Sequence, residues 1–195
     1  MTNKTRHNQL KRKLMDEGLK LMAARGIAGC KVEDITRAAE VGKGTFFNLF
    51  ASKDDFVAHA VDYCLSDLNR RLSPLSFSTA PAEQLLASLG GVYLRYFQLR
   101  PEVAALLMQA LSLDTNGPVG EKIKEMFSNH LDSSAALAEK ACQALGWQNN
   151  SRELVLSLFS LSCGFFWVGR SLVNPPGPLL ERLSKVLAKG LTPDN

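Results

Sequence analysis

One stretch of the sequence decides the fold: 31-KVEDITRAAEVGKGTFFNLFASKDDF-56. Apolar residues with helical spacing lie on both sides of a tight corner, 40-EVGKG-44, which predicts short helices over 32–39 and 43–50. Helices shorter than about 12–15 residues are marginal in water on their own. We therefore expect the segment before the corner to clamp both helices and to present the second one.

The flanking segments supply such a clamp. A helix over about 8–25 is predicted by Met15, Leu19 and Met22 on one face, with Gly26 ending it in the left-handed conformation. Gly18 inside this helix indicates close packing against a neighbour. A further helix over 53–72 begins after Ser52, an N-cap candidate. A helix, a short helix, a corner and a second short helix form the helix-turn-helix pattern.

The remaining sequence predicts helices and no strands. Helical segments follow at 83–99, from Pro101, after the break at 116–118 to about 145, at 151–173 and at 179–191, separated by Gly- and Pro-containing breaks. The expected fold is all-α with about nine helices, comprising a helix-turn-helix head and a helical body. We expect the head to span 1–53 and the body 54–195, with the helix at about 53–72 connecting them.

Charge is concentrated at the N-terminal end. The chain of 195 residues has a formal net charge of +4, but residues 1–53 hold eleven basic and five acidic side chains. A basic head on a slightly acidic body is typical of a polyanion-binding protein, although basic segments also serve solubility or membrane attraction.

Several function classes are disfavoured. Four cysteines (Cys30, Cys64, Cys142, Cys163) lie far apart without a CxxC pair or a histidine cluster, so we expect free thiols, no metal and a reducing cytoplasm. The N-terminus lacks the apolar region of a secretory signal. HExxH, GxSxG and Walker motifs are missing from the sequence, so we expect neither catalytic residues nor a cofactor.

An uncharged run, 154-LVLSLFSLSCGFFWVG-169, raises the possibility of a membrane span. Sixteen residues fall short of the roughly 20 that a bilayer requires, and charged residues bracket the run. A core helix or a helix in a dimer interface explains it better than membrane insertion does.

The stretches 14-LMDEGLKLMAARGI-27 and 32-VEDITRAAEVGKGTFFNLFASKDDF-56 resemble the N-terminal domain of the tetracycline-repressor (TetR) family of bacterial transcriptional regulators. The resemblance covers roughly residues 10–60. It implies an all-α homodimer with a three-helix head that binds double-stranded operator DNA. It also implies a connecting helix and a C-terminal body that binds a small-molecule effector.

The resemblance assigns DNA-binding roles to individual positions. The second short helix would read base edges in the major groove while phosphate contacts fix its register. By this resemblance Asn48 is a base reader and Lys53 a phosphate contact. The full set of candidate DNA-binding residues is Lys31, Lys43, Gly44, Thr45, Phe47, Asn48 and Lys53. The basic residues Lys4, Arg6, Lys11 and Arg12 would add non-specific attraction.

Some positions depart from the family pattern. Phe47 stands where the family usually has a tyrosine whose hydroxyl reaches a phosphate, and Leu49 replaces a frequent tyrosine or histidine. Lys31 occupies a position that commonly carries a threonine or serine. We expect Phe46, Leu49 and Phe50 to pack the head rather than to read DNA. These departures leave open an alternative function, a ligand-binding or scaffold protein with a degenerate head.

The body is rich in aromatic residues. By analogy with the family, an effector pocket lies between its helices, and we expect an apolar or aromatic ligand held by one or two polar contacts. Its candidate residues are Tyr93, Tyr96, Phe97, Met108, Phe127, His130, Phe159 and Phe166. The candidate dimer interface is a four-helix bundle formed with Phe165, Val168, Leu172, Leu180, Leu183 and Leu187.

The resemblance also implies a mechanism. The dimer would present two recognition helices about one DNA turn apart to a near-palindromic operator. Effector binding would favour a spacing that no longer fits. By analogy with the family, repression is expected rather than activation.

Overall fold

The computed structural model describes residues 3–112, 117–146 and 151–172. Within these ranges the chain forms eight α-helices and one 3-10 helix, so the expected all-α fold is confirmed. The ninth expected helix, at 179–191, lies outside the described residues. The elements are α1 (Asn3–Gly29), α2 (Val32–Ala38), α3 (Lys43–Phe47), α4 (Lys53–Leu72), η1 (Ser73–Phe77), α5 (Ala82–Leu99), α6 (Pro101–Ala110), α7 (Pro118–Ala144) and α8 (Ser151–Leu172).

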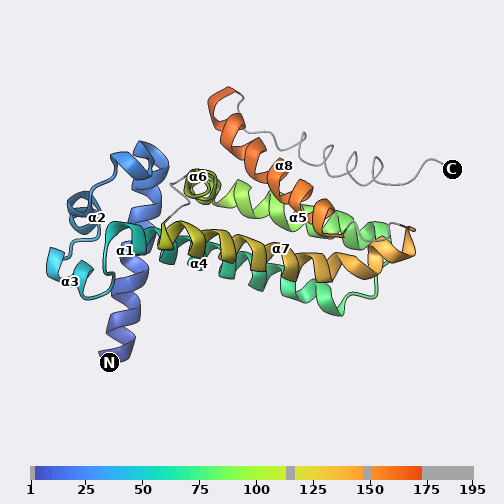
Figure 1. Ribbon diagram of the computed structural model, residues 1–195, viewed down its shortest axis with the longest axis horizontal. Coiled ribbons are helices and arrows are strands. Elements are labelled where there is room, and N and C mark those ends of the chain that lie inside the picture. Colours follow the sequence, from blue (N-terminus) through green and yellow to red (C-terminus); the bar gives the residue numbers. More distant parts are fainter. Residues whose placement is uncertain (1–2, 113–116, 147–150, 173–195) are drawn as a thin grey trace.

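The helices divide into a head and a body (Figure 1). Helices α2 and α3 lie at one end of the molecule beside α1, and α4 leads from them into the body. In the body α7 packs on α4, and α5 and α8 pack on each other and on α7. Helix α6 lies between α1 and α8 and contacts both, so it joins the head to the body.

Helix α1 differs from its expected form at both ends. It begins at Asn3 rather than near residue 8, so the basic residues expected on an arm lie on its first turns. Gly26 interrupts the helix with φ 77 and ψ 159. The positive φ was expected, but the value of ψ is extended and not left-handed helical, and a short helical turn continues to Gly29.

The close approach expected at Gly18 is present. A Cβ atom built at this position would lie 2.7 Å from Cε1 of the Phe56 ring, on α4. Only a glycine lets α1 and α4 approach this closely, and Phe56 is fully buried as a result. The glycine therefore serves the packing of the head against the connecting helix.

Helix α4 begins as predicted. Ser52 accepts a hydrogen bond at Oγ from the backbone N–H of Asp55 (3.0 Å). The Asp55 carboxylate in turn accepts from the backbone N–H of Ala51 (2.9 Å). These reciprocal bonds satisfy donors that the first turn of a helix leaves unpaired, and they fix the direction in which α4 leaves the head.

Helix α8 is amphipathic in the part whose side chains are described. Leu154, Val155, Leu158 and Phe159 are buried, whereas Leu156 and Leu161 are 45% and 53% exposed. None of the described helices is long and apolar enough to cross a membrane. The uncharged run thus packs one face on the body and leaves an apolar face open.

Candidate nucleic-acid interface and aromatic core

The corner between α2 and α3 is built from local conformations. Glu40 has φ 52, in the left-handed region that residues other than glycine seldom adopt. Its carboxylate forms an ion pair with Lys13 of α1 (2.8 Å). Gly42 is the N-cap of α3. Glu40, the residue with the left-handed backbone conformation, therefore links the corner to α1.

Helix α3 is shorter than predicted. It spans five residues, Lys43–Phe47, and Asn48 is its C-cap, whereas the apolar spacing predicted a helix to residue 50. The backbone N–H groups of Leu49 and Phe50 both bond to the Phe46 carbonyl, so a tight turn follows the helix. This turn keeps Phe46 and Phe50 on the same side, as a longer helix would have done.

An aromatic cluster holds α3 in place. Phe46 and Phe50 are buried, with ring centroids 5.2 Å apart. Both rings contact Phe56 of α4, at 5.4 Å and 4.9 Å. Each buried aromatic ring contributes a large apolar area to the packing. The prediction that Phe46 and Phe50 pack the head is confirmed, and Leu49 is half-buried against the same core.

The opposite side of α3 faces outward. Lys43, Gly44, Phe47 and Asn48 are exposed, and Thr45 is half-buried. Phe47 is 54% exposed, so its ring is accessible on the outer side of α3. A Cβ at Gly44 would meet no atom within 4 Å, so the backbone there is open to close approach. Five of the seven candidate DNA-binding residues thus come together on this short helix and its cap.

Ion pairs modulate the charge of this surface. The Lys43 ammonium pairs with the Glu33 carboxylate of α2. The hydrogen bond from Lys43 is the largest cause of a lowered pKa at Glu33, which keeps this carboxylate ionised beside the helix. Lys43 therefore offers less net positive charge than its sequence position suggests.

The two remaining candidate residues lie beside α3. Lys31 is exposed and is the N-cap of α2; its backbone N–H donates to the Asp34 carboxylate (3.3 Å). Lys53 is half-buried, and its ammonium donates to the Ile27 carbonyl (3.1 Å). Lys53 thus serves the end of α1, a role that its sequence position did not predict.

Two further residues were not among the sequence candidates. The side chain of Arg37, on α2, is 81% exposed, and among the described residues its one ion pair is a distant contact with Asp34 (3.9 Å). Gln109 of α6 accepts at Oε1 from the Ile27 N–H (2.8 Å) and donates from Nε2 to the Met22 carbonyl (3.5 Å). Arg37 could have been found from the sequence, because it is one of the eleven basic residues within 1–53. No local signal marks Gln109, since its partners are 82 and 87 residues away.

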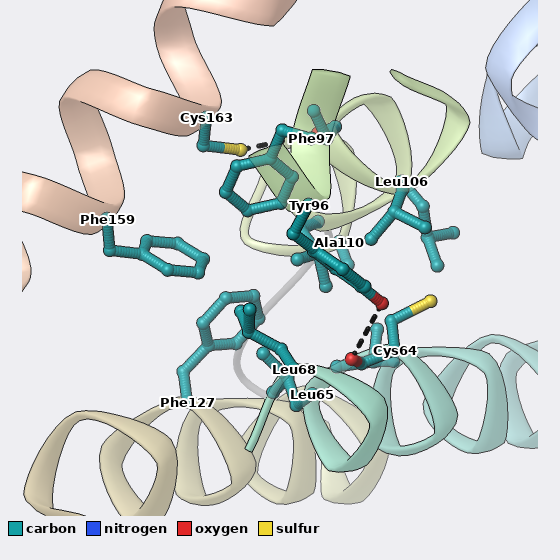
Figure 2. Packing of buried hydrophobic residues seen from close by; sticks show 14 of the residues in the cluster. Cys64, Leu65, Leu68, Tyr96, Phe97, Leu106, Ala110, Phe127, Phe159 and Cys163 are labelled. Atoms are coloured by element: carbon teal, nitrogen blue, oxygen red, sulfur yellow. Dashed lines mark hydrogen bonds between the residues drawn. The ribbon is translucent and has the colours of Figure 1, made fainter. Parts of the chain in front are cut away.

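In the body, five of the eight pocket candidates form one cluster. The Phe159 ring of α8 lies 5.5–6.0 Å, between centroids, from His130, Tyr93, Phe97 and Phe127. All five are buried. Figure 2 shows Phe97, Phe127 and Phe159 converging from α5, α7 and α8. The rings pack mainly edge to face, an arrangement that aromatic pairs favour.

A polar chain runs through this cluster. His130 Nδ1 lies 2.5 Å from the Asn69 amide oxygen, and Nε2 lies 3.1 Å from the Tyr93 hydroxyl. The amide oxygen can only accept, so Nδ1 carries the proton and Nε2 accepts from Tyr93. Burial lowers the pKa of His130 to about 4, which keeps the imidazole neutral.

The other pocket candidates lie apart from the polar chain. The Tyr96 hydroxyl donates to the Cys64 carbonyl of α4 (3.0 Å), and Figure 2 shows its ring pointing away from Phe159. Met108 is half-buried, and Phe166 is buried about two turns beyond Phe159 on α8. The sequence therefore identified the aromatic residues of the body, but it did not show that Tyr96 faces α4 and not Phe159.

The dimer candidates are only partly described. Phe165 is half-buried on α8. Val168 and Leu172 lie in the last turns of α8, where side chains are outside the described part, and Leu180, Leu183 and Leu187 lie outside it altogether. Of these six residues, only Phe165 has a described side chain.

Comparisons with known proteins agree with this architecture. The family model of bacterial regulatory proteins of the tetR family matches residues 14–60, which contain α2, α3 and the start of α4. Over residues 14–60 the chain thus matches the TetR family of bacterial regulatory proteins. The HTH-type transcriptional repressor DhaR of Mycobacterium sp. (strain GP1) is 43% identical over 60 residues, which make up 31% of this chain and 30% of DhaR. This family consists of transcriptional regulators and not of enzymes.

Solved structures of regulatory proteins match the fold over most of this chain. The transcriptional regulator FadR from Bacillus subtilis, in complex with stearoyl-CoA, superposes with a TM-score of 0.76 at 17% identity, covering 92% of this chain and 98% of that one. The fatty acid degradation regulator FadR from Bacillus halodurans gives the same TM-score and coverage at 16% identity. At such identities the likeness concerns the fold.

Proposed function

We propose that this protein is a sequence-specific DNA-binding transcriptional repressor that a small effector releases from its operator. The observation that carries the proposal is the two-sided α3, with Phe46 locked into the head and Phe47 and Asn48 presented to solvent. A helix displayed in this way fits the major groove, which is about 12 Å wide. The asparagine amide can pair with adenine, and Phe47 can contact a thymine methyl group.

The phosphate contacts of the proposal surround α3. Lys31, Lys53 and Arg37 lie on neighbouring elements, and a family of DNA-binding regulators shares the segment that contains them. Phosphate contacts position a protein on DNA without reading its sequence. The proposed head ends near residue 53, and α4 connects it to the body.

The proposed protein acts as a homodimer on a near-palindromic operator. Support comes from the apolar side chains that α8 leaves uncovered, Leu156 and Leu161, which a second copy of the chain would bury. Two heads would then present α3 about one DNA turn apart. Binding to operator DNA implies that the protein works in the cytoplasm.

The proposed effector binds at the aromatic cluster around Phe159. The neutral His130 and the Tyr93 hydroxyl would supply the few polar contacts that a mostly apolar ligand needs. The buried hydroxyl of Ser162 has no hydrogen-bond partner within the described residues, so it is a further candidate. FadR from Bacillus subtilis, which shares the fold, holds stearoyl-CoA, a ligand with a long apolar chain.

Release would follow from movement of α6. This helix contacts α8 on one side and α1 on the other, and Gln109 bonds to α1 at its break. Rings displaced by a ligand would shift α8 and α6 and, through Gln109, the head. The coupling must be reciprocal, so operator DNA would weaken effector binding by the same factor.

Fluorescence anisotropy with the DNA upstream of the protein's own gene tests the proposal. We expect tight binding that scrambled DNA does not reproduce, with a linear fall of log affinity against log salt concentration. Asn48→Ala should weaken specific binding by about 1–3 kcal/mol, the range for one lost base contact. Asn129→Ala, an exposed asparagine on α7, is the matched control and should leave affinity unchanged.

Equal binding to both DNA sequences would refute sequence-specific recognition. In that case a scaffold protein with a degenerate head would be the better description. Loss of binding in the Asn129→Ala control as well would show that the change acts through folding and not through a base contact.

A further inference from the structure

A groove opens on the body between the end of α4 and α5. Its volume is about 470 Å³, and its lining includes Arg71, Gln84, Ser88, Gly91, Arg95 and Tyr96. These residues lie outside the cluster around Phe159. Figure 1 shows the later turns of α4 and α5 away from α2 and α3, so the groove does not belong to the proposed DNA-binding surface.

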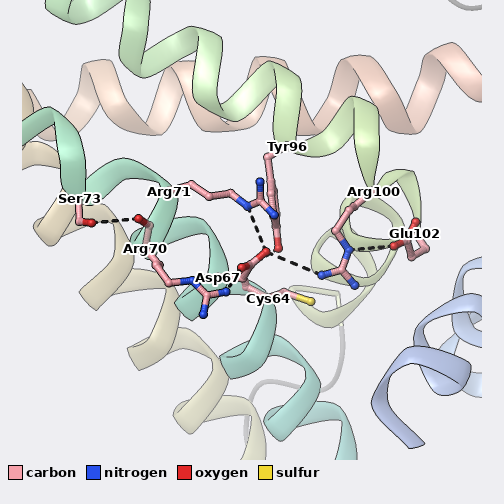
Figure 3. Close-up of polar contacts among 8 residues, drawn as sticks. All are labelled: Cys64, Asp67, Arg70, Arg71, Ser73, Tyr96, Arg100 and Glu102. Atoms are coloured by element: carbon pink, nitrogen blue, oxygen red, sulfur yellow. Dashed lines mark hydrogen bonds and ion pairs between the residues drawn. The ribbon is translucent and has the colours of Figure 1, made fainter. Parts of the chain in front are cut away.

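Arg71 is held in a fixed orientation within this groove. Its Nε donates to the Asp67 carboxylate (3.2 Å), and its guanidinium lies over the Tyr96 ring, 5.3 Å from the centroid. Tyr96 is itself fixed by its bond to the Cys64 carbonyl. Figure 3 shows Arg71 between Asp67 and Tyr96. Because Nε is occupied by Asp67, the terminal nitrogens of Arg71 remain available as donors.

Positive charge exceeds negative charge around the groove. Asp67 is a single carboxylate that pairs with Arg70, Arg71 and, at 3.9 Å, Arg100. Burial opposes ionisation of Asp67, but hydrogen bonds from Arg70 and Arg71 outweigh it and lower its pKa, so it stays charged. Arg100 pairs more closely with Glu102 (3.1 Å), so two carboxylates lie beside three guanidinium groups and one positive charge remains in excess.

Arg95 adds a second guanidinium to the groove. It is exposed on α5 and makes no ion pair within the described part of the chain. The residues that line the groove, all of them described, include no carboxylate. Gly91 leaves the floor open, and Ser88 and Gln84 offer a hydroxyl and an amide.

We propose that this groove is a binding site for a phosphate group, with Arg71 and Arg95 as its cationic ligands. Guanidinium groups present parallel N–H donors that match the oxygens of a phosphate, and such charge-assisted bonds are about twice as strong as neutral ones. Two cations suit a doubly charged phosphate better than a singly charged carboxylate. The site does not depend on the proposed DNA-binding function.

Isothermal titration calorimetry with inorganic pyrophosphate at low salt tests the site, because salt would screen the exposed arginines. We expect wild-type protein to bind and Arg95→Gln to bind about ten-fold more weakly or worse. Lys140→Gln removes one exposed charge from α7 and should match wild type. Arg71→Gln is expected to weaken binding too, but Arg95 is the cleaner position because it supports no other described residue.

Three outcomes would overturn the proposal. Wild-type protein that binds no pyrophosphate would remove the site. An equal loss of pyrophosphate affinity in Lys140→Gln and Arg95→Gln would show that binding depends on the overall charge of the protein and not on this groove. Tighter binding of octanoate than of pyrophosphate would show that the groove prefers carboxylates. Anisotropy with operator DNA separates the functions, because Arg95→Gln should leave DNA affinity unchanged; a parallel loss would make the groove a contact for DNA.

Discussion

Replacing Gly18 with alanine tests how the head is held to the connecting helix. Alanine favours the helical state by about 1 kcal/mol over glycine, so propensity alone predicts a more stable protein. The new methyl group would instead lie 2.7 Å from Cε1 of Phe56. Overpacking of this kind costs about 1–3 kcal/mol. Phe56 cannot turn aside because it is fully buried against Phe46 and Phe50.

The clash should therefore outweigh the gain in propensity, and Gly18→Ala should lower the free energy of unfolding by roughly 1 kcal/mol. Urea denaturation followed by circular dichroism, at one protein concentration, measures this difference. Gly91→Ala is the control: it lies in α5, and a Cβ there would meet no atom within 4 Å. It should stabilise the protein by about 0.5–1 kcal/mol. The reasoning fails if Gly18→Ala stabilises the protein as much as Gly91→Ala does.

Two further predictions concern buried polar contacts. Gln109→Ala leaves the Ile27 N–H without its acceptor and should lower the free energy of unfolding, measured by urea denaturation, by about 1–3 kcal/mol. The control Gln143→Ala, at an exposed position on α7, should lower it by less than about 0.5 kcal/mol. Equal effects of the two changes would contradict a stabilising role for the Gln109 bond. The pKa of His130 is about 4 in the folded protein against about 6.5 when unfolded, so the unfolded state takes up the proton first as the pH falls. Stability should drop by roughly 2 kcal/mol from pH 7 to pH 5 through this group, and His130→Gln should remove that part of the pH dependence; an unchanged pH profile in the variant would contradict it.

Local features of the fold were predictable from the sequence. Apolar spacing, the capping serine at position 52 and the breaks at glycine and proline located most of the helices within a few residues. The clamp was predictable too, since Gly18 in a helix indicates a close neighbour. The helix positions and the cap depend on residues near one another in the chain, where propensity and periodicity apply.

The length of α3 was not predictable in the same way. Phe46, Leu49 and Phe50 have the spacing of one helical face, but a helix followed by a tight turn places the same rings on the same side. The apolar pattern cannot distinguish the two arrangements, because both bury the same side chains. Backbone hydrogen bonds to the Phe46 carbonyl decide between them, and these leave no mark in the sequence.

Long-range partners escaped prediction for a different reason. Tyr96 has an aromatic neighbour at position 97 and looked equivalent to it, yet its hydroxyl bonds to α4 while Phe97 faces α8. Lys53 and Gln109 meet at α1 from distant parts of the chain. Tertiary packing sets such pairings, and a single sequence carries no direct record of them.

The bond between Lys53 and the Ile27 carbonyl has a consequence for association with DNA. A lysine side chain carries about 2 kcal/mol of rotamer entropy, which it loses when it is fixed on a phosphate. Here folding has already restricted the side chain, and the ammonium keeps two of its three protons for another acceptor. A phosphate docking beside α4 would thus meet a cation whose ordering is complete, which would lower the entropic cost of the proposed contact between Lys53 and the DNA backbone.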